Sequence, residues 1–234
     1  MIDFHSHILP GMDDGSKDEN ESLAMLKMLA EQKVDTVCAT PHFYPEDENV
    51  KSFLSRREEA YAKISGKLDG TLPEIRLGAE ISYYDGISYL EDFGKLTLQD
   101  TRILLVEMPM AGWSKFQRRE LLNLAGSTGC TVVLAHIDRY LDLQERGTFE
   151  ELKENGILFQ VNASFFKGFF NRKKAISFLR RGMIHFVGSD AHNLKDRKPE
   201  IGAAFDFIAK KEGDEALEWL NSMERGFLRM LSNK

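Results

Sequence analysis

A regular alternation between short apolar runs and amphipathic segments is the feature that most constrains the fold of this chain. Seven apolar runs have the length and composition of β-strands, at residues 2–7, 34–40, 75–81, 103–108, 131–136, 157–162 and 184–190. Helical periodicity marks the segments between and after them, at residues 16–31, 49–68, 117–127, 148–154, 172–181, 199–211, 214–221 and 223–231. Because most of the strand runs are almost continuously apolar, they indicate a parallel sheet that is covered on both faces.

Seven such units are one short of a complete eight-stranded α/β barrel. The sequence therefore predicts an α/β fold, namely a distorted seven-stranded (β/α)7 barrel of the TIM type. An open, doubly wound sheet is the alternative. No low-complexity linker, internal repeat or composition change divides the chain, so residues 1–234 are expected to form a single domain.

The composition narrows the classes of function. A net charge of −6 argues against a nucleic-acid binder that relies on phosphate contacts. An anionic substrate stays open, because bound metal ions can reverse the local charge. We expect no secretory signal peptide, since charged residues begin at position 3, and no run is long enough to cross a membrane. These features predict a cytoplasmic protein without membrane insertion.

The two cysteines do not indicate a cysteine-based phosphatase. Cys38 and Cys130 lie in or beside apolar strand runs, so they are expected to be reduced and buried. The residues six positions after them are Tyr44 and His136, whereas a phosphatase loop built around a thiolate requires an arginine there. The catalytic chemistry is therefore sought elsewhere.

Six of the seven predicted strands end in side chains that bind metals. His5 and His7 are two apart on a strand, so they project from the same face and can grip one ion. In a parallel α/β barrel the carboxyl ends of the strands meet at one mouth, where active sites lie. Five of the six histidines of the chain fall at these ends. The candidate ligands at strand ends are His5, His7, His42, Glu80, Glu107, His136, Asp190 and His192.

Asp14, in a glycine-flanked loop, adds a ninth candidate ligand. Nine groups exceed the four positions of a tetrahedral zinc site, and they indicate two or three divalent ions bridged by Glu80. Imidazole and carboxylate ligands without a thiolate fit manganese, iron or zinc, with manganese favoured. Asp13 is interpreted as a structural partner in the loop and His185, which lies in mid-strand, as a structural histidine. Taken alone, His42 is equally consistent with an ordinary loop histidine.

With these residues the chain resembles the polymerase-and-histidinol-phosphatase (PHP) superfamily of metal-dependent phosphoesterases. The HSHILPG stretch at residues 5–11, followed by Asp13 and Asp14, is similar to the bacterial capsular-polysaccharide (CpsB/YwqE-type) protein-tyrosine phosphatases. The resemblance implies the PHP fold, a trinuclear metal site, and contacts from Arg139 and Arg197 to the substrate phosphate. The matching segments are residues 3–7, 39–42, 78–80, 135–140 and 188–192.

The resemblance also implies a reaction and a partner. A metal-dependent protein-tyrosine phosphatase would hydrolyse its phosphomonoester by attack of a metal-bound hydroxide. The implied substrate is the phosphotyrosine-containing tail of a bacterial tyrosine kinase in capsular or exopolysaccharide synthesis. Phe43 and Tyr44 are candidates for a wall beside the aromatic ring, or else packing residues. Apolar residues near the C-terminus, among them Leu228 and Leu231, would either pack on the barrel or form a homo-oligomer contact.

Two other functions stay open from the sequence. A small-molecule phosphatase, such as one acting on histidinol phosphate, would use the same metal site and differ only in its substrate-facing loops. A non-catalytic regulatory module that keeps a metal for structure belongs to another class, and it would be expected to have lost some ligands. The candidate set here is complete, which favours an enzyme.

Overall fold

A computed structural model of the chain describes residues 1–229. The end of the last predicted helix, at residues 230–231, lies outside the described residues. Every strand pairing in the structure is parallel, so the predicted α/β class with a parallel sheet is confirmed. The strands are β1 (Ile2–Ser6), β2 (Thr36–Ala39), β3 (His42–Phe43), β4 (Glu74–Leu77), β5 (Glu80–Ser82), β6 (Ile103–Glu107), β7 (Thr131–Leu134), β8 (Leu158–Asn162) and β9 (Phe186–Gly188).

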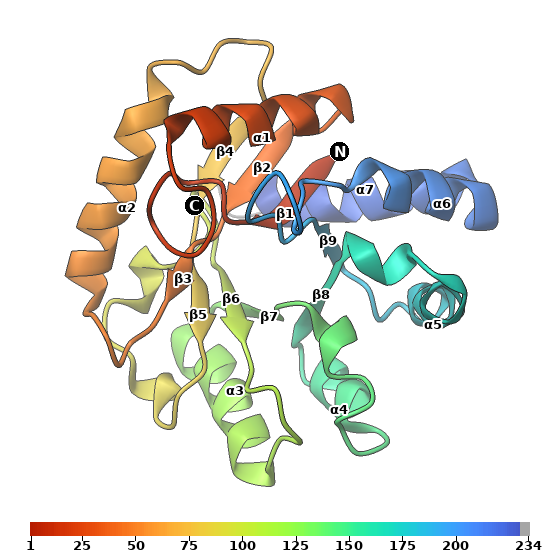
Figure 1. The fold of residues 1–234 in the computed structure, drawn as a ribbon. Coiled ribbons are helices and arrows are strands. Elements are labelled where there is room, and N and C mark those ends of the chain that lie inside the picture. Colours follow the sequence, from red (N-terminus) through yellow and green to blue (C-terminus); the bar gives the residue numbers. More distant parts are fainter. Residues whose placement is uncertain (230–234) are drawn as a thin grey trace.

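The strands form two hydrogen-bonded sheets, in the orders β1-β2-β4 and β3-β5-β6-β7-β8-β9. The sheet curls so that its strands surround a common centre, with helices on the outside (Figure 1). The first and last strands meet where Ser6 forms a parallel bridge to Ala191. We call the contact of β1 with β9 and with the residues that follow β9, up to Ala191, the seam.

Two of the predicted strands are interrupted. The run at residues 75–81 divides into β4 and β5 at Gly78, whose carbonyl oxygen accepts a hydrogen bond from Arg57 Nη1 (2.9 Å). A Cβ at Gly78 would lie 3.2 Å from Leu98 Cδ1, so the backbone passes close to a neighbouring loop. The run at residues 34–40 gives β2, and β3 resumes the strand direction after Pro41, which has no amide hydrogen for a ladder.

The helices agree with the predictions in number up to residue 212 but differ at their ends. They are α1 (Glu19–Glu31), α2 (Val50–Ser65), α3 (Lys115–Thr128), α4 (Thr148–Glu154), α5 (Phe169–Arg180), α6 (Gly202–Glu212) and α7 (Asp214–Arg229), with short 3₁₀ turns at η1 (Ile87–Tyr89), η2 (Phe93–Lys95), η3 (Ile137–Arg139) and η4 (Ala163–Phe166). Helix α1 begins at Glu19 because Asp18 caps it: the Asp18 side chain accepts hydrogen bonds from the amides of Asn20 and Glu21.

The prediction of two separate helices over residues 214–231 was wrong. A single helix, α7, runs from Asp214 to Arg229. Asn221, where the break was placed, stays helical, and its Nδ2 donates a hydrogen bond to the carbonyl oxygen of Leu217 (3.0 Å). Because no glycine or proline stands between residues 215 and 225, nothing in the backbone stops the helix there.

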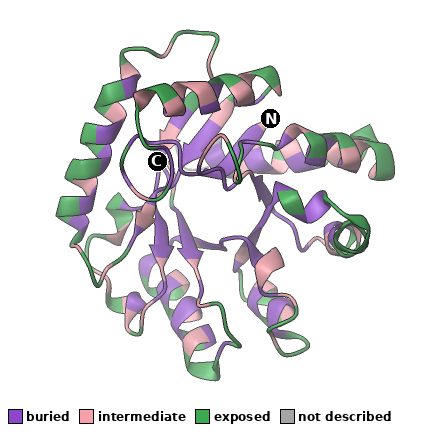
Figure 2. Ribbon diagram, in the orientation of Figure 1, coloured by how far each residue is buried: buried purple, intermediate pink, exposed green. Residues whose placement is uncertain are grey.

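Figure 2 shows that the strands are almost entirely buried, whereas the helices outside them are exposed on their outer sides. At the seam, Phe4 of β1 stacks on Phe186 of β9 with ring centroids 3.8 Å apart. Cys38 and Cys130 are buried and free, as predicted. Within the described part of the chain, no helix has the length and apolar character needed to cross a membrane.

Candidate metal centre

The structure brings all nine predicted ligands together at the carboxyl ends of the strands. Eight of them form three overlapping groups, within each of which the ligand atoms lie within 4.8 Å of one another. The ninth, His136, has its Nε2 2.9 Å from Glu80 Oε1 and 3.4 Å from Glu107 Oε1. The three groups are His7, Asp14, His42 and His192; His5, His7 and Asp190; and His42, Glu80 and Glu107.

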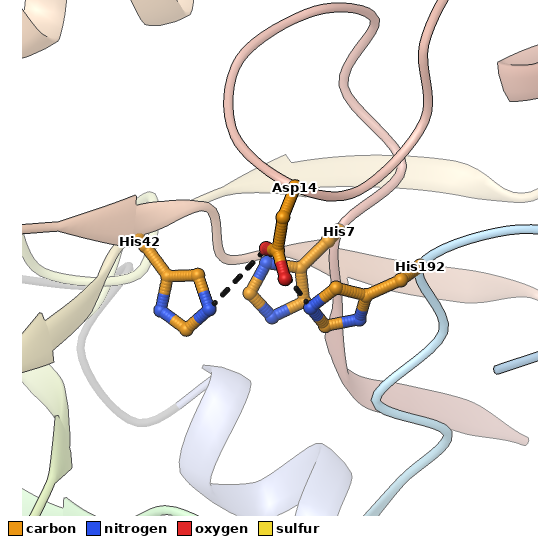
Figure 3. A group of neighbouring side chains, drawn as sticks. All are labelled: His7, Asp14, His42 and His192. Atoms are coloured by element: carbon orange, nitrogen blue, oxygen red, sulfur yellow. Dashed lines mark ion pairs between the residues drawn. The ribbon is translucent and has the colours of Figure 1, made fainter.

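The four side chains of the first group point toward one another, with Asp14 between His42 and His192 (Figure 3). Asp14 Oδ1 lies 3.6 Å from His42 Nε2 and 3.3 Å from His192 Nε2. The rings of His7 and His192 lie almost against each other, with centroids 3.8 Å apart. The side chain of Asp14 is 64% exposed whereas that of His192 is 1% exposed, so the group has one carboxylate facing solvent above buried imidazoles.

Asp13 orients His7 from outside the cluster. Its Oδ2 accepts hydrogen bonds from His7 Nδ1 (2.7 Å) and from the amide of His42 (2.9 Å). An ionised carboxylate can only accept hydrogen bonds, so Nδ1 of His7 carries the hydrogen and Nε2 faces the other ligands. A carboxylate behind a metal-binding histidine commonly fixes the ring in this way. The interpretation of Asp13 as a structural partner agrees with this geometry.

Glu80 lies at the centre of the cluster. Its Oε2 is 3.2 Å from His5 Nε2, 3.3 Å from His7 Nε2 and 3.0 Å from His42 Nδ1, while Oε1 faces His136. Burial alone would raise the pKa of this carboxyl, but the surrounding imidazoles outweigh burial and hold its pKa well below the usual range. Glu80 is therefore a buried negative charge shared by four imidazoles.

The same charges act on the imidazoles. Burial would lower the pKa of His7, but the hydrogen bond to Asp13 and the nearby negative charge of Glu80 outweigh burial and raise the pKa to about 10. His136 has its pKa raised to about 9 by Glu107 and Glu80 against the effect of burial. The buried carboxylates thus stabilise positive charge in the cluster, either on the imidazoles or on a cation that lies between them.

Several buried polar atoms of the cluster lack an aligned hydrogen-bond partner. Within the described part of the chain, they are Glu80 Oε2, His42 Nδ1, His136 Nδ1 and His192 Nε2. Glu80 Oε2 and His42 Nδ1 are close, but their orientation does not make a hydrogen bond. Buried groups of this kind are costly when unsatisfied, and nitrogen and oxygen donors converging on shared space suit divalent cations. The residues present therefore fit a multinuclear metal site.

Left-handed backbone conformations direct two of the ligands. His136 has φ 33° and Asp190 has φ 53°, which side chains other than glycine adopt infrequently and at a cost. The amide of His136 donates to Gln160 Oε1 (2.6 Å), and that of Asp190 donates to the carbonyl oxygen of His5 (2.8 Å). These hydrogen bonds hold the chain in a sharp turn at the ends of two strand runs.

Sequence reasoning missed two supporting amides on β8. Gln160 Oε1 lies 3.2 Å from His5 Nδ1 and also accepts the amide of His136, and Asn162 Nδ2 donates to Asp190 Oδ2 (2.9 Å). The signal was present, because two amides separated by one residue share a face of an otherwise apolar strand. The strand without a predicted ligand thus supplies groups that orient the ligands of other strands.

The seam fixes His5 in a further way that the sequence did not reveal. Asp3 Oδ1 and Oδ2 accept hydrogen bonds from the amide (2.7 Å) and hydroxyl (2.6 Å) of Ser189. A Cβ at Gly188 would lie only 2.6 Å from His5 Cβ, so only glycine allows the last strand this close to the first. The metal-binding end of β1 is therefore held by residues near the other end of the chain.

Arg139 and Arg197 converge on Asp190 from different elements. Arg139 Nη2 donates to Asp190 Oδ2, and Arg197 Nη2 donates to Oδ1 (2.7 Å). The side chains of Arg139 and Arg197 are 31% and 37% exposed, and both line a pocket of about 320 Å³ beside the cluster. Burial would raise the pKa of Asp190, but His5 and these arginines outweigh burial and lower it. Three lysines also line this pocket, namely Lys167, Lys195 and Lys198.

Three other residues singled out in the sequence lie near or away from the cluster. His185 Nδ1 accepts a hydrogen bond from the amide of Phe159 (3.1 Å), and burial lowers its pKa to about 4; it belongs to none of the ligand groups. Phe43 is buried against Phe53, whereas Tyr44 is 42% exposed and stacks on the His42 ring (5.3 Å). Of the two aromatic residues, only Tyr44 faces the mouth.

Comparisons with known proteins agree with the site. A family model described as "Capsular polysaccharide synthesis, CpsB/CapC" matches residues 1–224. The chain is 37% identical over 229 residues to the tyrosine-protein phosphatase CpsB of Streptococcus pneumoniae, covering 91% of each protein. It is 31% identical over 224 residues to the tyrosine-protein phosphatase YwqE of Bacillus subtilis (strain 168), covering 92% of this chain and 86% of that protein.

A solved structure is also similar over nearly the whole chain. It belongs to a study of YwqE from Bacillus subtilis and CpsB from Streptococcus pneumoniae, described as unique metal-dependent tyrosine phosphatases. The TM-score is 0.84 at 25% sequence identity, and the alignment covers 98% of this chain and 94% of that one. The resemblance inferred from the short motifs is thus confirmed by matches that extend far beyond them.

Proposed function

The chain belongs to the CpsB/CapC family, and we propose that it is a metal-dependent protein-tyrosine phosphatase acting on a bacterial tyrosine kinase of capsular or exopolysaccharide synthesis. The observation that carries the proposal is the convergence of nine imidazole and carboxylate groups from six strand runs and one loop. Relatives that share 31–37% of their residues with this chain are named tyrosine-protein phosphatases. The absence of an arginine six residues after either cysteine is consistent with metal-based chemistry.

We further propose that the sheet is a distorted seven-stranded PHP barrel within one catalytic domain. β2 with β3, and β4 with β5, would each count as one interrupted strand. The bridge from Ser6 to Ala191 would then bring the first strand beside the last. This arrangement supports the proposal because it places the end of each strand run at one mouth.

Two or three divalent cations, manganese foremost and iron or zinc as alternatives, are the proposed cofactors. His5, His7 and Asp190 would hold one ion, Asp14, His42 and His192 a second, and Glu80, Glu107 and His136 a third. Such ions, when bound, neutralise phosphoryl oxygens and acidify a water molecule. Glu80 reaches imidazoles of all three sets, so it is the proposed bridging carboxylate.

Arg139 and Arg197 are the proposed phosphate-binding residues. Each uses one terminal nitrogen on Asp190, and a guanidinium has five N–H donors in all. The remaining donors are available to phosphoryl oxygens in the adjoining pocket, where the fork geometry of arginine matches phosphate well. Asp190 therefore positions both cations while it contributes a ligand atom.

The leaving group suits a protein without a dedicated general acid. A phenol has a pKa of about 10, so tyrosinate leaves more easily than an alkoxide. Tyr44, stacked on His42 at the mouth, would offer its ring face to the phenyl group of the substrate. No covalent phospho-enzyme is required.

Chelation tests the metal requirement. Removal of bound metal by EDTA should abolish hydrolysis of an aryl phosphate, and added Mn²⁺ should restore it. Iodoacetamide should leave activity unchanged, because Cys38 and Cys130 are 0% and 7% exposed. Activity that survived metal removal, as checked by elemental analysis, would refute the proposed chemistry.

A paired substrate assay tests the specificity. The metal-loaded protein should have a higher kcat/KM for phosphotyrosyl peptides than for histidinol phosphate. The reverse order would assign a small-molecule phosphatase on the same scaffold. No hydrolysis of either compound by metal-loaded protein would instead indicate a non-catalytic metal-binding module.

A further inference from the structure

A second hollow, outside the metal centre, lies between α5 and α6. It has a volume of about 580 Å³. Ile176 of α5 and Phe207 of α6 form apolar parts of its wall, and both are partly buried. Five basic residues and no acidic residue line it, although the protein carries a net charge of −6. The basic residues are Arg172, Lys173, Arg180, Arg181 and Lys211.

Three of these cations have no acidic partner in the described part of the chain. Arg180 pairs with Glu212 and Arg181 with Glu150. The other three, by contrast, form no ion pair there. Arg172 lies over the Phe207 ring (4.7 Å from Cζ to the centroid) and Lys173 lies over the Phe169 ring (4.4 Å from Nζ). Aromatic faces thus hold two cations in place without neutralising them.

Exposed aromatic side chains stand at one end of the hollow. Phe169 and Phe170, the first two residues of α5, are 67% and 79% exposed, and the outer side of α5 is open to solvent (Figure 2). Large aromatic side chains in this position bury much area when a partner binds. Exposed apolar side chains beside unpaired cations are typical of surfaces that bind other proteins.

The hollow is connected along the chain to the phosphate-binding pocket. Ser164 and Lys167 line that pocket together with Arg139 and Arg197. Phe169, only two residues after Lys167, lines the hollow. A peptide whose phosphorylated residue reaches the arginines can therefore continue along this segment toward α5.

We propose that the hollow between α5 and α6 docks an acidic, aromatic-containing segment of the phosphotyrosyl substrate, away from the reacting phosphate. This proposal rests on the protein-tyrosine phosphatase activity proposed above. A peptide fits better than a lipid surface, because Ile176 and Phe207 line a hollow between two helices and do not project from a convex face. Acidic side chains would pair with Lys173 and Lys211, and an aromatic side chain would enter the hollow.

Charge reversal with a matched control tests the docking surface. The test variant is Lys173→Glu/Lys211→Glu, and the control is Lys174→Glu/Lys210→Glu. The control makes the same change on the same helices, but its residues do not line the hollow, and Lys174 instead pairs with Asp142 (2.8 Å). None of these lysines touches the metal cluster or the arginine pocket.

Three substrates separate docking from chemistry. They are a phosphotyrosyl peptide with an acidic and aromatic flank, the same peptide with a neutral flank, and p-nitrophenyl phosphate. The test variant should raise KM for the acidic peptide about tenfold, as expected for two lost charge pairs. Added salt should also raise KM of the wild-type protein for this peptide, because salt screens the charge pairs. Values for the neutral peptide and for p-nitrophenyl phosphate should be unchanged, and the control variant should match wild type throughout.

A binding measurement distinguishes failure of docking from failure of the proposed function. Fluorescence anisotropy of the labelled, unphosphorylated acidic peptide should show binding to wild type and to the control but weakened binding to the test variant. That result without hydrolysis would keep the docking surface and refute the phosphatase activity. Equal KM changes for both peptides would overturn the docking proposal. So would charge-dependent binding to phosphatidylglycerol vesicles without a preference for the acidic peptide.

Discussion

Two buried glutamates, Glu80 and Glu224, show how differently this protein treats the same side chain. Both are almost fully buried, at 1% and 0% exposure. Glu80 faces four imidazoles, and its pKa lies well below the usual range. Among the described residues, Glu224 accepts one hydrogen bond, from the amide of Val187 to its Oε1 (3.1 Å), and burial raises its pKa to about 8. Burial alone does not decide whether a carboxyl is ionised, because the available partners decide it.

The comparison also separates two parts of the seam. Val187, bonded to Glu224, is only three residues before Asp190 of the metal cluster. The pKa of Asp190 is lowered by His5 and the arginines, whereas no cation pairs with Glu224 within the described residues. Negative charge is therefore concentrated at the ends of the strands, and the buried carboxyl below them favours its neutral form.

Of the substitutions considered, Glu80→Gln should have the largest effect, and it should distinguish Glu80 clearly from Glu224. The change keeps the shape but removes the charge that four imidazoles share. We expect phosphatase activity to fall by at least about 10³-fold, because metal-based charge stabilisation contributes several kcal/mol. Elemental analysis should show a reduced metal content. Glu224→Gln is the matched control, and it should retain full activity and metal content.

Arg139→Ala and Arg197→Ala should each have an intermediate effect. Each removes one cation that pairs with Asp190 and lines the adjoining pocket. We expect kcat/KM for an aryl phosphate to fall about 10²-fold for each, the size seen when one donor to a developing charge is lost. Metal content should persist. A variant that lost its metal and its activity together would assign that arginine a structural role instead.

Gln160→Leu should have a smaller effect on the same site. It removes the side-chain oxygen Oε1, which accepts a hydrogen bond from the backbone amide of His136 and lies 3.2 Å from His5 Nδ1. Changes to groups that orient ligands typically cost 10–100-fold in affinity or activity, so we expect about a tenfold weaker metal affinity. Titration of metal-free protein with Mn²⁺, followed by activity, measures the change. An unaltered affinity would show that the backbone turn at His136 is sufficient.

Glu224→Gln should change only the pH dependence of stability. The folded-state pKa of about 8 exceeds the ordinary value of 4.5, so between these values the folded protein keeps a proton that the unfolded chain has lost. The free energy of unfolding of wild type should therefore fall as the pH rises through this window, by about 1.4 kcal/mol per pH unit from this group. Glutamine cannot ionise, so the free energy of unfolding of the variant, measured by urea titration, should rise relative to that of wild type from pH 5 to pH 8. A constant difference would contradict the raised pKa.

The candidate metal site could be predicted because it depends on position within a repeated pattern. Once the strands were assigned as parallel, the convergence of His5, Glu80 and Asp190 followed from the geometry of strand ends. Gln160 was missed, because an amide inside a strand has many structural uses and its partners are distant in sequence. The hollow beside α5 depends on how two helices pack, which periodicity does not specify.

The errors in the fold have local physical causes. Gly78 divides the run predicted as one strand at residues 75–81, because its carbonyl oxygen accepts a hydrogen bond from Arg57 on another element. Asn221 was taken as a helix end, yet no glycine or proline interrupts residues 215–225 and α7 stays continuous. Propensities describe the isolated segment, and a tertiary contact such as that of Arg57 overrides them at Gly78.

The seam has a consequence for how the protein is made. His5 and His7 leave a ribosome before Ser189, Asp190 and His192, which follow about 180 residues later along the chain. At typical synthesis rates this interval lasts roughly 10 to 40 s. During that time β1 lacks one of its two neighbours, so the nascent chain holds only a partial set of ligands. Metal loading of the complete cluster is therefore expected after translation rather than during it, once the last strand has closed on the first.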